Sequence, residues 1–296
     1  MDFSGQVAMV TGAGSGIGQA IAISLARSGA KVGIVDVDKR GIERSVSAIS
    51  EAGQEAFALP CDVSNQPEVA AAVERLVSRF GTVDILVNNA GIGGSTTLVQ
   101  EIQEETWDRV MAVNLKAAFL TCRAVLPTMK AHQRGKILNV ASFAARKISF
   151  TAGADYTASK YGLIGFSKHL AYEVARDGIN VNVLCPGATN TAMTGEGLAP
   201  AVRNSVASTI PLGRWATSQD QANAVLFLVS DMASMITGAV LDVDGGILIS
   251  FGDYPADMAR RDRRTAQMVE DRQNPKFEAP LHEKSIITKQ KSNRKV

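Results

Sequence analysis

The sequence predicts an α/β fold: a single doubly wound parallel sheet of about seven strands with helices on both faces. From residue 6 to about residue 245, short apolar segments rich in Val and Ile alternate with amphipathic segments of helical length. This alternation is typical of successive strand–helix–strand units. No linker interrupts the stretch, so we expect one catalytic domain over residues 1–250.

The expected elements follow one another in strict alternation. Strands are expected at Gln6–Val10, Lys31–Asp36, Glu55–Pro60, Asp84–Asn88, Lys136–Val140, Asn180–Cys185 and Ala239–Val243. Helices are expected at Ile17–Ser28, Lys39–Ala52, Gln66–Phe80, Glu104–Ala131, Asp155–Asp177 and Ser218–Ser230. Each strand is a short β-branched run that suits a sheet covered on both faces. Ligands of such a sheet bind at the carboxyl ends of its strands.

Two segments depart from this alternation. Thr189–Pro211 holds small residues and no clean strand, and we expect a mobile lid there, with a plain surface insertion as the alternative. Residues 251–296 carry 11 Lys and Arg against 7 Asp and Glu, whereas the remaining residues carry 20 against 22. We expect a charged C-terminal extension that is partly ordered or interacts with a neighbouring subunit; a solvated tail is equally open.

Composition excludes several functional classes. Hydrophobic residues make up 46% and charged residues 20% of the chain. The first residues lack the layout of a signal peptide, and we expect a cytoplasmic protein that binds no membrane. The three cysteines and three histidines have no metal-ligand or disulfide spacing, so no metal site is expected. The slightly acidic body predicts no nucleic-acid partner.

The first expected strand runs into a glycine-rich loop, TGAGSGIG at residues 11–18, which opens the following helix. Glycines let the main chain approach a pyrophosphate, and the free N–H groups at the start of the helix then face that anion. The sequence therefore predicts a dinucleotide-binding Rossmann fold. We expect cofactor contacts at Gly12, Ser15, Gly16, Ile17 and Gly18.

The ends of the next three strands supply further cofactor contacts. Asp36 ends the second strand, where a carboxylate accepts hydrogen bonds from ribose hydroxyls and repels a 2′-phosphate, so NAD is expected rather than NADP. Asp62 and Val63 follow the third strand and are expected at the adenine, with helix capping as the alternative role of Asp62. The residues expected after the fourth strand are Asn89, mainly as a structural brace, Ala90 and Gly91.

Six short motifs follow one another between about residues 4 and 248. They are TGAGSGIG at 11–18, NNAG at 88–91, the helix from Trp107 to Asn114, NVAS at 139–142, YTASK at 156–160, and PG at 186–187 with Thr191. Together they resemble the short-chain dehydrogenase/reductase family. The resemblance implies an oxidoreductase that moves a hydride between a nicotinamide cofactor and a CH–OH carbon, and a homotetramer. The helical stripe Leu163, Phe166, Leu170 and Val174 either joins such an interface or faces its own sheet.

The reacting groups are expected on one helix and one strand end. Tyr156 and Lys160 are one helical turn apart and share a face. A phenol with a pKa of about 10 is a poor base at neutral pH, so we expect the lysine ammonium to lower the pKa of Tyr156 and make it the acid/base. Ser142 should hold the substrate oxygen. The resemblance implies that Asn114 supports a water beside Lys160 and that Lys160 also bonds the nicotinamide ribose.

The family pattern implies a further binding segment after the sixth strand. Pro186, Gly187, Thr189 and Thr191 are expected to meet the carboxamide and phosphates of the cofactor, although Thr191 could instead cap a lid helix. Ser142 and Tyr156 are 14 residues apart, one more than is usual in the family, which should alter the pocket rather than the mechanism.

The expected pocket walls, Ile92–Ser95, Phe143–Phe150 and Thr189–Leu198, are mainly apolar. They favour a secondary alcohol, a cyclic diol or a ketone as substrate, with Arg146 at the surface rather than on the substrate. Two alternatives stay open. A 3-oxoacyl-thioester reductase of the same fold is disfavoured by Asp36 if it needs NADPH, and a non-enzymatic NAD-binding scaffold is disfavoured by the complete catalytic set.

Overall fold

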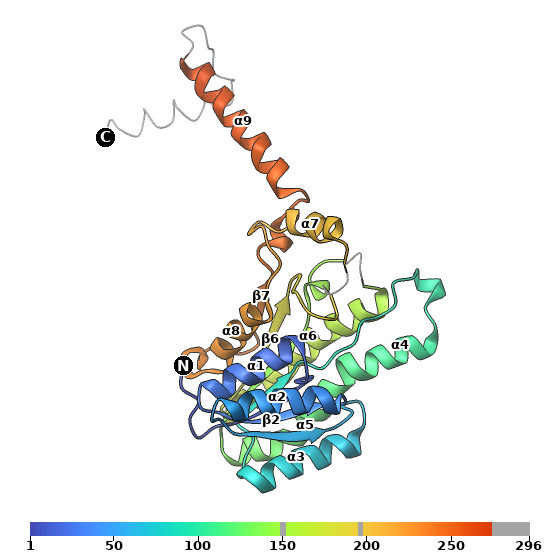
Figure 1. Cartoon of the computed structure of the whole chain (residues 1–296), viewed down its shortest axis with the longest axis vertical. Coiled ribbons are helices and arrows are strands. Elements are labelled where there is room, and N and C mark those ends of the chain that lie inside the picture. Colours follow the sequence, from blue (N-terminus) through green and yellow to red (C-terminus); the bar gives the residue numbers. More distant parts are fainter. Residues whose placement is uncertain (149–151, 195–197, 274–296) are drawn as a thin grey trace, which may run out of the picture. The chain divides into compact units, whose positions relative to one another are not determined.

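Seven parallel strands form one sheet in the computed structural model, which describes residues 1–148, 152–194 and 198–273 (Figure 1). The strands are β1 (Val7–Thr11), β2 (Lys31–Asp36), β3 (Ala56–Pro60), β4 (Ile85–Asn88), β5 (Gly135–Val140), β6 (Ile179–Pro186) and β7 (Val240–Val243). Their order is β3-β2-β1-β4-β5-β6-β7, and every neighbouring pair is parallel. The predicted fold class is confirmed. The reversal of order between β1 and β4 creates the crevice in which such sheets bind ligands.

Helices cover both faces of this sheet. They are α1 (Gly16–Arg27), α2 (Lys39–Glu51), α3 (Gln66–Phe80), α4 (Glu104–Met111), α5 (Ala117–Ala131), α6 (Ala154–Val174), α7 (Pro200–Ser208) and α8 (Ser218–Val229). Helices α1, α2 and α8 share one buried apolar cluster with the sheet, and α3, α5 and α6 share the other. Alternate strand residues point to opposite faces, so Ala8 and Val10 join the first cluster while Val7 and Met9 join the second.

The single helix expected over Glu104–Ala131 is interrupted by a π-helical turn at Ala112–Lys116. By length and composition alone, this stretch is apolar enough to cross a membrane. Half of its most apolar window is buried inside the protein. Its apolar side packs against β4 and β5, so its hydropathy reflects burial in the core of the sheet.

The apolar stripe of α6 faces the chain's own sheet. Leu163, Leu170 and Val174 are buried at 5% exposure or less, and Phe166 packs beside them. The stripe therefore packs on the chain's own sheet rather than joining a subunit interface.

The described part of Thr189–Pro211 contains a helix, α7, which begins at a proline and which the sequence did not predict. The chain divides into two compact units between Ser250 and Phe251. The second unit contains α9 (Tyr254–Gln273), whose arginine-rich stretch at residues 260–264 is exposed. Residues 195–197 of the expected lid, Phe150 of the expected pocket wall, and residues 274–296 lie outside the described part of the chain.

Candidate active site

Helix α6 and the end of β5 bring three predicted catalytic side chains together. Lys160 Nζ lies 5.7 Å from the centre of the Tyr156 ring, on the same face of the helix. The side chains of Tyr156 and Ser142 are neighbours, and the Ser142 hydroxyl acts to lower the pKa of the Tyr156 phenol. Ser142 begins a 3-10 turn and accepts the N–H of Ala144 at 3.1 Å, which orients its side chain. The cluster lies at the carboxyl edge of the parallel sheet, where ligands are expected.

Lys160 is a buried amine with little compensation. Only 3% of the residue is exposed, and Nζ donates a hydrogen bond to the backbone oxygen of Val140 at 3.0 Å. Burial lowers the pKa of Lys160 to about 8, because removing the ammonium from water disfavours its charged form. The amine is therefore mainly charged at neutral pH.

The pKa of Tyr156 moves opposite to the sequence expectation. Burial raises it, and the neighbouring hydroxyl of Ser142 lowers it by less. The expected lowering by Lys160 is wrong for the protein alone, because the amine lies over the face of the ring and donates to Val140 rather than to the phenolic oxygen. Tyr156 is thus a protonated phenol at neutral pH.

Asn114 lies in the π-helical turn, and its amide holds the backbone of Ile92. The N–H of Ile92 donates to Oδ1 at 2.8 Å, and Nδ2 donates to the oxygen of Ile92 at 3.0 Å. Nδ2 also lies 3.2 Å from Ser159 Oγ on α6. A π turn turns a side chain away from the regular helical register, and here it places a buried amide between the loop after β4 and α6.

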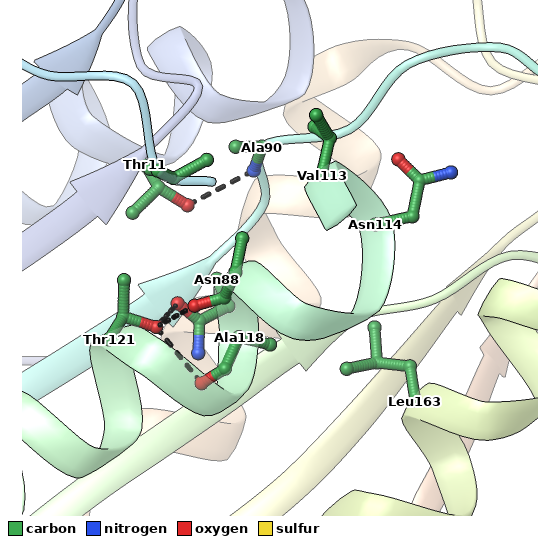
Figure 2. A pocket seen from close by; sticks show the side chains of 10 residues that line it. Thr11, Asn88, Ala90, Val113, Asn114, Ala118, Thr121 and Leu163 are labelled. Carbon is green, nitrogen blue, oxygen red and sulfur yellow. Dashed lines mark hydrogen bonds between the residues drawn. The ribbon is translucent and has the colours of Figure 1, made fainter. Parts of the chain in front are cut away.

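A small cavity lies beside Asn114, between β4 and helix α5 (Figure 2). Its volume of about 10 Å³ leaves room for about one water molecule. Thr121 donates to Asn88 Oδ1 at 2.6 Å, and the hydroxyl of Thr11 accepts the N–H of Ala90 at 3.0 Å (Figure 2). These bonds brace the strand ends next to the reacting groups.

The glycine-rich loop is packed so closely that side chains are excluded. A methyl group on Gly18 would lie 2.1 Å from the oxygen of Gly12 and 2.4 Å from Asn89 Nδ2. The amide of Asn89 donates to the oxygens of Thr11 and Gly12 at 3.1 and 3.2 Å, so Asn89 braces the loop as predicted.

The start of α1 suits an anion. Among the described residues no side chain caps this helix, because Ser15 occupies the capping position without bonding to the backbone. The first N–H groups of a helix have no intrahelical acceptor, and together with the helix dipole they favour a negative charge. The backbones of Gly16, Ile17 and Gly18 therefore fit the pyrophosphate of a dinucleotide.

Asp36 is held in one orientation at the end of β2. Oδ2 accepts the N–H of Gly14 at 2.9 Å, and Oδ1 accepts the N–H of Asp38 at 3.0 Å. A methyl group on Gly14 would lie 2.9 Å from Asp36 Oδ2 and 3.2 Å from the backbone of Gly41. The glycine-rich loop at Gly14 therefore has room for the Asp36 carboxylate but not for a side chain of its own.

Asp62 has partners within the chain. Its Oδ1 accepts the N–H and hydroxyl of Ser64 at 2.9 and 2.7 Å, and its Oδ2 lies 3.6 Å from Arg109. The hydrogen bonds with Ser64 hold the pKa of Asp62 below its ordinary value. The alternative role of helix cap is wrong, because Asn65 caps α3. The adenine contacts of Asp62 and Val63 remain predictions; Val63 lines the cavity described above.

The segment after β6 lies against the glycine-rich loop. A methyl group on Gly16 would lie 3.5 Å from Thr191 Cγ2. Thr191 shares a hydrogen bond with Thr194 rather than capping α7, which follows Ala199. Thr189 is buried, and its hydroxyl donates to the oxygen of Gly187. Its side chain is therefore occupied within the chain.

The structure also shows the surroundings of Gly91 and Arg146. A methyl group on Gly91 would lie 3.3 Å from Asn114 Oδ1 and 3.4 Å from Lys160 Nζ, so the missing side chain leaves room for both polar groups. Arg146 makes two contacts of 3.1 Å with Asp242, in agreement with its expected surface position.

Three further residues shape the site and were missed by sequence reasoning. Gly14 stood inside the motif without an assigned role. Gln221 on α8 donates from Nε2 to Thr189 Oγ1 and to the oxygen of Val243, and its buried Oε1 has no partner among the described residues. Asp155 is buried beside Tyr156. Only Gly14 had a local sequence signal.

Comparison with known proteins assigns the family. A sequence profile described as Enoyl-(Acyl carrier protein) reductase matches residues 12–248. The chain is 40% identical over 248 residues to the 3-oxoacyl-[acyl-carrier-protein] reductase FabG of Escherichia coli, covering 83% of this chain and 99% of that protein. The chain belongs to the short-chain dehydrogenase/reductase family. It is therefore an oxidoreductase of carbonyl and hydroxyl groups with a nicotinamide cofactor.

Solved structures of the family agree with this assignment. Levodione reductase superposes with a TM-score of 0.81 at 32% identity, covering 84% of this chain and all of that one. The 3-ketoacyl-(acyl-carrier-protein) reductase of Brucella melitensis complexed with NADH superposes with a TM-score of 0.77 at 40% identity, covering 83% of this chain and all of that one. The similarity ends near residue 248, before α9.

Proposed function

We propose that the chain is an NAD-dependent dehydrogenase/reductase of secondary alcohols and ketones with Tyr156 as its acid/base. The observation that supports this most directly is the buried amine of Lys160 over the ring of Tyr156, with Ser142 as the neighbour of the phenol. A bound nicotinamide dinucleotide supplies or accepts the hydride. In the direction of reduction, Tyr156 donates its proton to the carbonyl oxygen, while Ser142 hydrogen-bonds the same oxygen and stabilises its developing negative charge.

In the direction of oxidation, the proton path runs the other way. Tyr156 must first be a phenolate to accept the alcohol proton, and its raised pKa makes this form scarce at neutral pH. Lys160 is charged below about pH 8 but does not offset this raised pKa in the protein alone, because its amine lies over the ring and donates to Val140. We further propose that Lys160 bonds the nicotinamide ribose and that Asn114 supports a water beside it.

NAD rather than NADP is the proposed cofactor. Both oxygens of Asp36 are fixed by backbone N–H groups at the place where the adenosine ribose is expected, and a 2′-phosphate there would meet a negative charge. A side chain on Gly14 would collide with Asp36, so the loop has no room for a phosphate-binding residue at that position. The Brucella neighbour was solved with NADH.

The proposed substrate is a mainly apolar secondary alcohol, cyclic diol or ketone. The alternative, reduction of a 3-oxoacyl thioester, is favoured by the 40% identity to FabG. The two are separated by comparing kcat/KM for oxidation of secondary alcohols and cyclic diols with NAD against reduction of acetoacetyl thioesters with NADH and NADPH. A much higher value for the thioester with NADPH would overturn both the substrate and the cofactor proposals.

Tyr156→Phe tests the proposed role of the acid/base. We expect turnover to fall at least about a hundredfold, the usual contribution of a positioned proton donor, while NADH affinity measured by fluorescence titration stays within about twofold. Ser142→Ala should likewise lower turnover and leave NADH affinity nearly unchanged. A Tyr156→Phe variant with full activity would refute the assignment.

We propose a cytoplasmic homotetramer as the working form. Large side chains on α5 and α6 are exposed in the single chain, Phe119 at 42%, Tyr161 at 49% and Tyr172 at 86%, and aromatic side chains are enriched at subunit interfaces. Light scattering should give four times the chain mass, and Phe119→Glu should reduce it. A monomer at micromolar concentration would contradict the proposal.

A further inference from the structure

The loop after β4 crosses the start of α6 at very short range. A methyl group on Gly94 would lie 2.4 Å from Asp155 Oδ1 and 2.8 Å from the Cβ of Tyr156. A methyl group on Gly153 would lie 2.4 Å from the backbone oxygen of Ser95 and 2.8 Å from Asp155 Oδ1. The two glycines therefore let the backbones meet with the side chain of Asp155 between them.

Asp155 joins these two backbones. It has no exposed surface. Oδ2 accepts the N–H of Ser95 at 2.8 Å, and Oδ1 accepts the N–H of Tyr156 at 2.8 Å. Within the described residues, Asp155 makes no ion pair, so these backbone donors are its main compensation for burial. A buried N–H that loses its acceptor is unfavourable, and the carboxyl group therefore fixes the loop and the helix to each other.

The same loop has a second attachment. The amide of Asn114 binds both the N–H and the oxygen of Ile92, three residues before Ser95. Between the two attachments lie Gly93 and Gly94, which have the widest conformational freedom of all residues. Without Asp155, the described residues leave this loop one hydrogen-bonded attachment to the helices, that of Ile92 to Asn114.

We infer that Asp155 is a positioning residue that fixes the loop Gly91–Ser95 against Tyr156 and thereby sets the affinity for the carbonyl or alcohol substrate. The inference rests on the proposed function, because Ile92–Ser95 is the proposed wall of the substrate pocket beside the proposed acid/base. Substrate affinity should depend on Asp155, whereas the glycine-rich loop at residues 11–18 is braced by other groups.

The test replaces Asp155 by Ala and by Asn in the full chain. For Asp155→Ala we expect the KM of a carbonyl substrate to rise about tenfold, the effect of one lost hydrogen bond, with kcat within about threefold and NADH affinity within about twofold. Asp155→Asn keeps one acceptor oxygen and should be intermediate. Amide hydrogen exchange of Ser95 should be slow in the wild type, fast in Asp155→Ala and intermediate in Asp155→Asn.

Asp84→Asn is the matched control. Asp84 is also buried, at 2% exposure, and accepts the N–H of Val7 at 2.9 Å, but it lies at the opposite edge of the sheet and is bonded to Arg134. This variant should lose stability without changing KM or the exchange of Ser95. An equal rise of KM in Asp84→Asn, or an unchanged KM in both Asp155 variants, would overturn the inference.

Gly94→Ala provides an independent check if Asp155→Ala does not fold. Its methyl group would displace the loop from Asp155 and Tyr156, so it should also raise KM and speed the exchange of Ser95; an unchanged exchange rate would overturn the inference. Exchange and NADH binding are measured without turnover. A failure of the proposed function, such as an active Tyr156→Phe, is therefore distinguishable from a failure of this inference.

Discussion

Replacing Lys160 by Met should stabilise the protein in the absence of cofactor while removing its activity. Burial lowers the pKa of Lys160 from 10.5 to about 8, so keeping the amine charged in the folded protein costs about 3 kcal/mol at neutral pH. Met preserves the unbranched shape without a charge. The lost hydrogen bond to Val140 offsets about 1 kcal/mol of this gain. The net stabilisation is therefore about 2 kcal/mol.

This stabilisation should depend on pH in a defined direction. Well below a pH of about 8, the amine is charged in both the folded and the unfolded protein, and the full cost is present. As the pH rises from about 8 towards 10.5, the folded protein releases the proton and the unfolded chain keeps it. The wild type then gains stability relative to the variant, and the difference between them shrinks.

Urea unfolding of both proteins without cofactor, at neutral pH and at about pH 9.5, measures the effect. Lys168→Met on the exposed side of the same helix is the control and should change the free energy of unfolding by less than about 0.5 kcal/mol. A Lys160→Met variant that is less stable than the wild type at neutral pH, or a gain that is the same at both pH values, would contradict the unfavourable burial of this amine.

Three other changes test separate parts of the structure. Asp36→Ser removes the carboxylate fixed by Gly14, so the ratio of kcat/KM for NADH to that for NADPH should fall at least about tenfold; an unchanged ratio would contradict the cofactor proposal. Thr217→Ala removes the capping box of α8 and should lower the free energy of unfolding, measured in urea, by about 1 kcal/mol, with KM unchanged. An unchanged free energy of unfolding would show that the cap does not contribute to stability. Because burial raises the pKa of Tyr156, the rate of alcohol oxidation should rise from neutral to alkaline pH; a rate that is highest in acid would exclude a phenolate base.

The parts of the fold that follow from local pattern were predicted from the sequence. The strands β1 and β2 are buried β-branched runs, and β2 begins and ends at the predicted residues, Lys31 and Asp36. Helix α7 was missed because its small and polar residues show no apolar stripe. Its proline in the first turn was the one available signal.

Features set by distant residues could not be predicted. The π-helical turn around Asn114 has no local signature; it coincides with hydrogen bonds to Ile92, 22 residues earlier in the chain. The partner of Asp155 lies 60 residues away, at Ser95. The direction of the pKa shift of Tyr156 depends on where the Lys160 amine points, and spacing along a helix fixes the shared face but not that direction.

The unfavourable features of this site, a buried amine and an uncapped helix start, lie at the carboxyl edge of the sheet. Asp84 at the opposite edge is fully paired with Arg134 and Val7, whereas Lys160 is buried with a single backbone acceptor and α1 begins without a side-chain cap among the described residues. Both features leave positive charge or free donors facing the place where a dinucleotide would bring hydroxyl and phosphate oxygens. A protein can retain such local instability because the rest of its core supports it. A substitution that stabilises the protein alone by removing this charge should therefore also weaken its response to the cofactor.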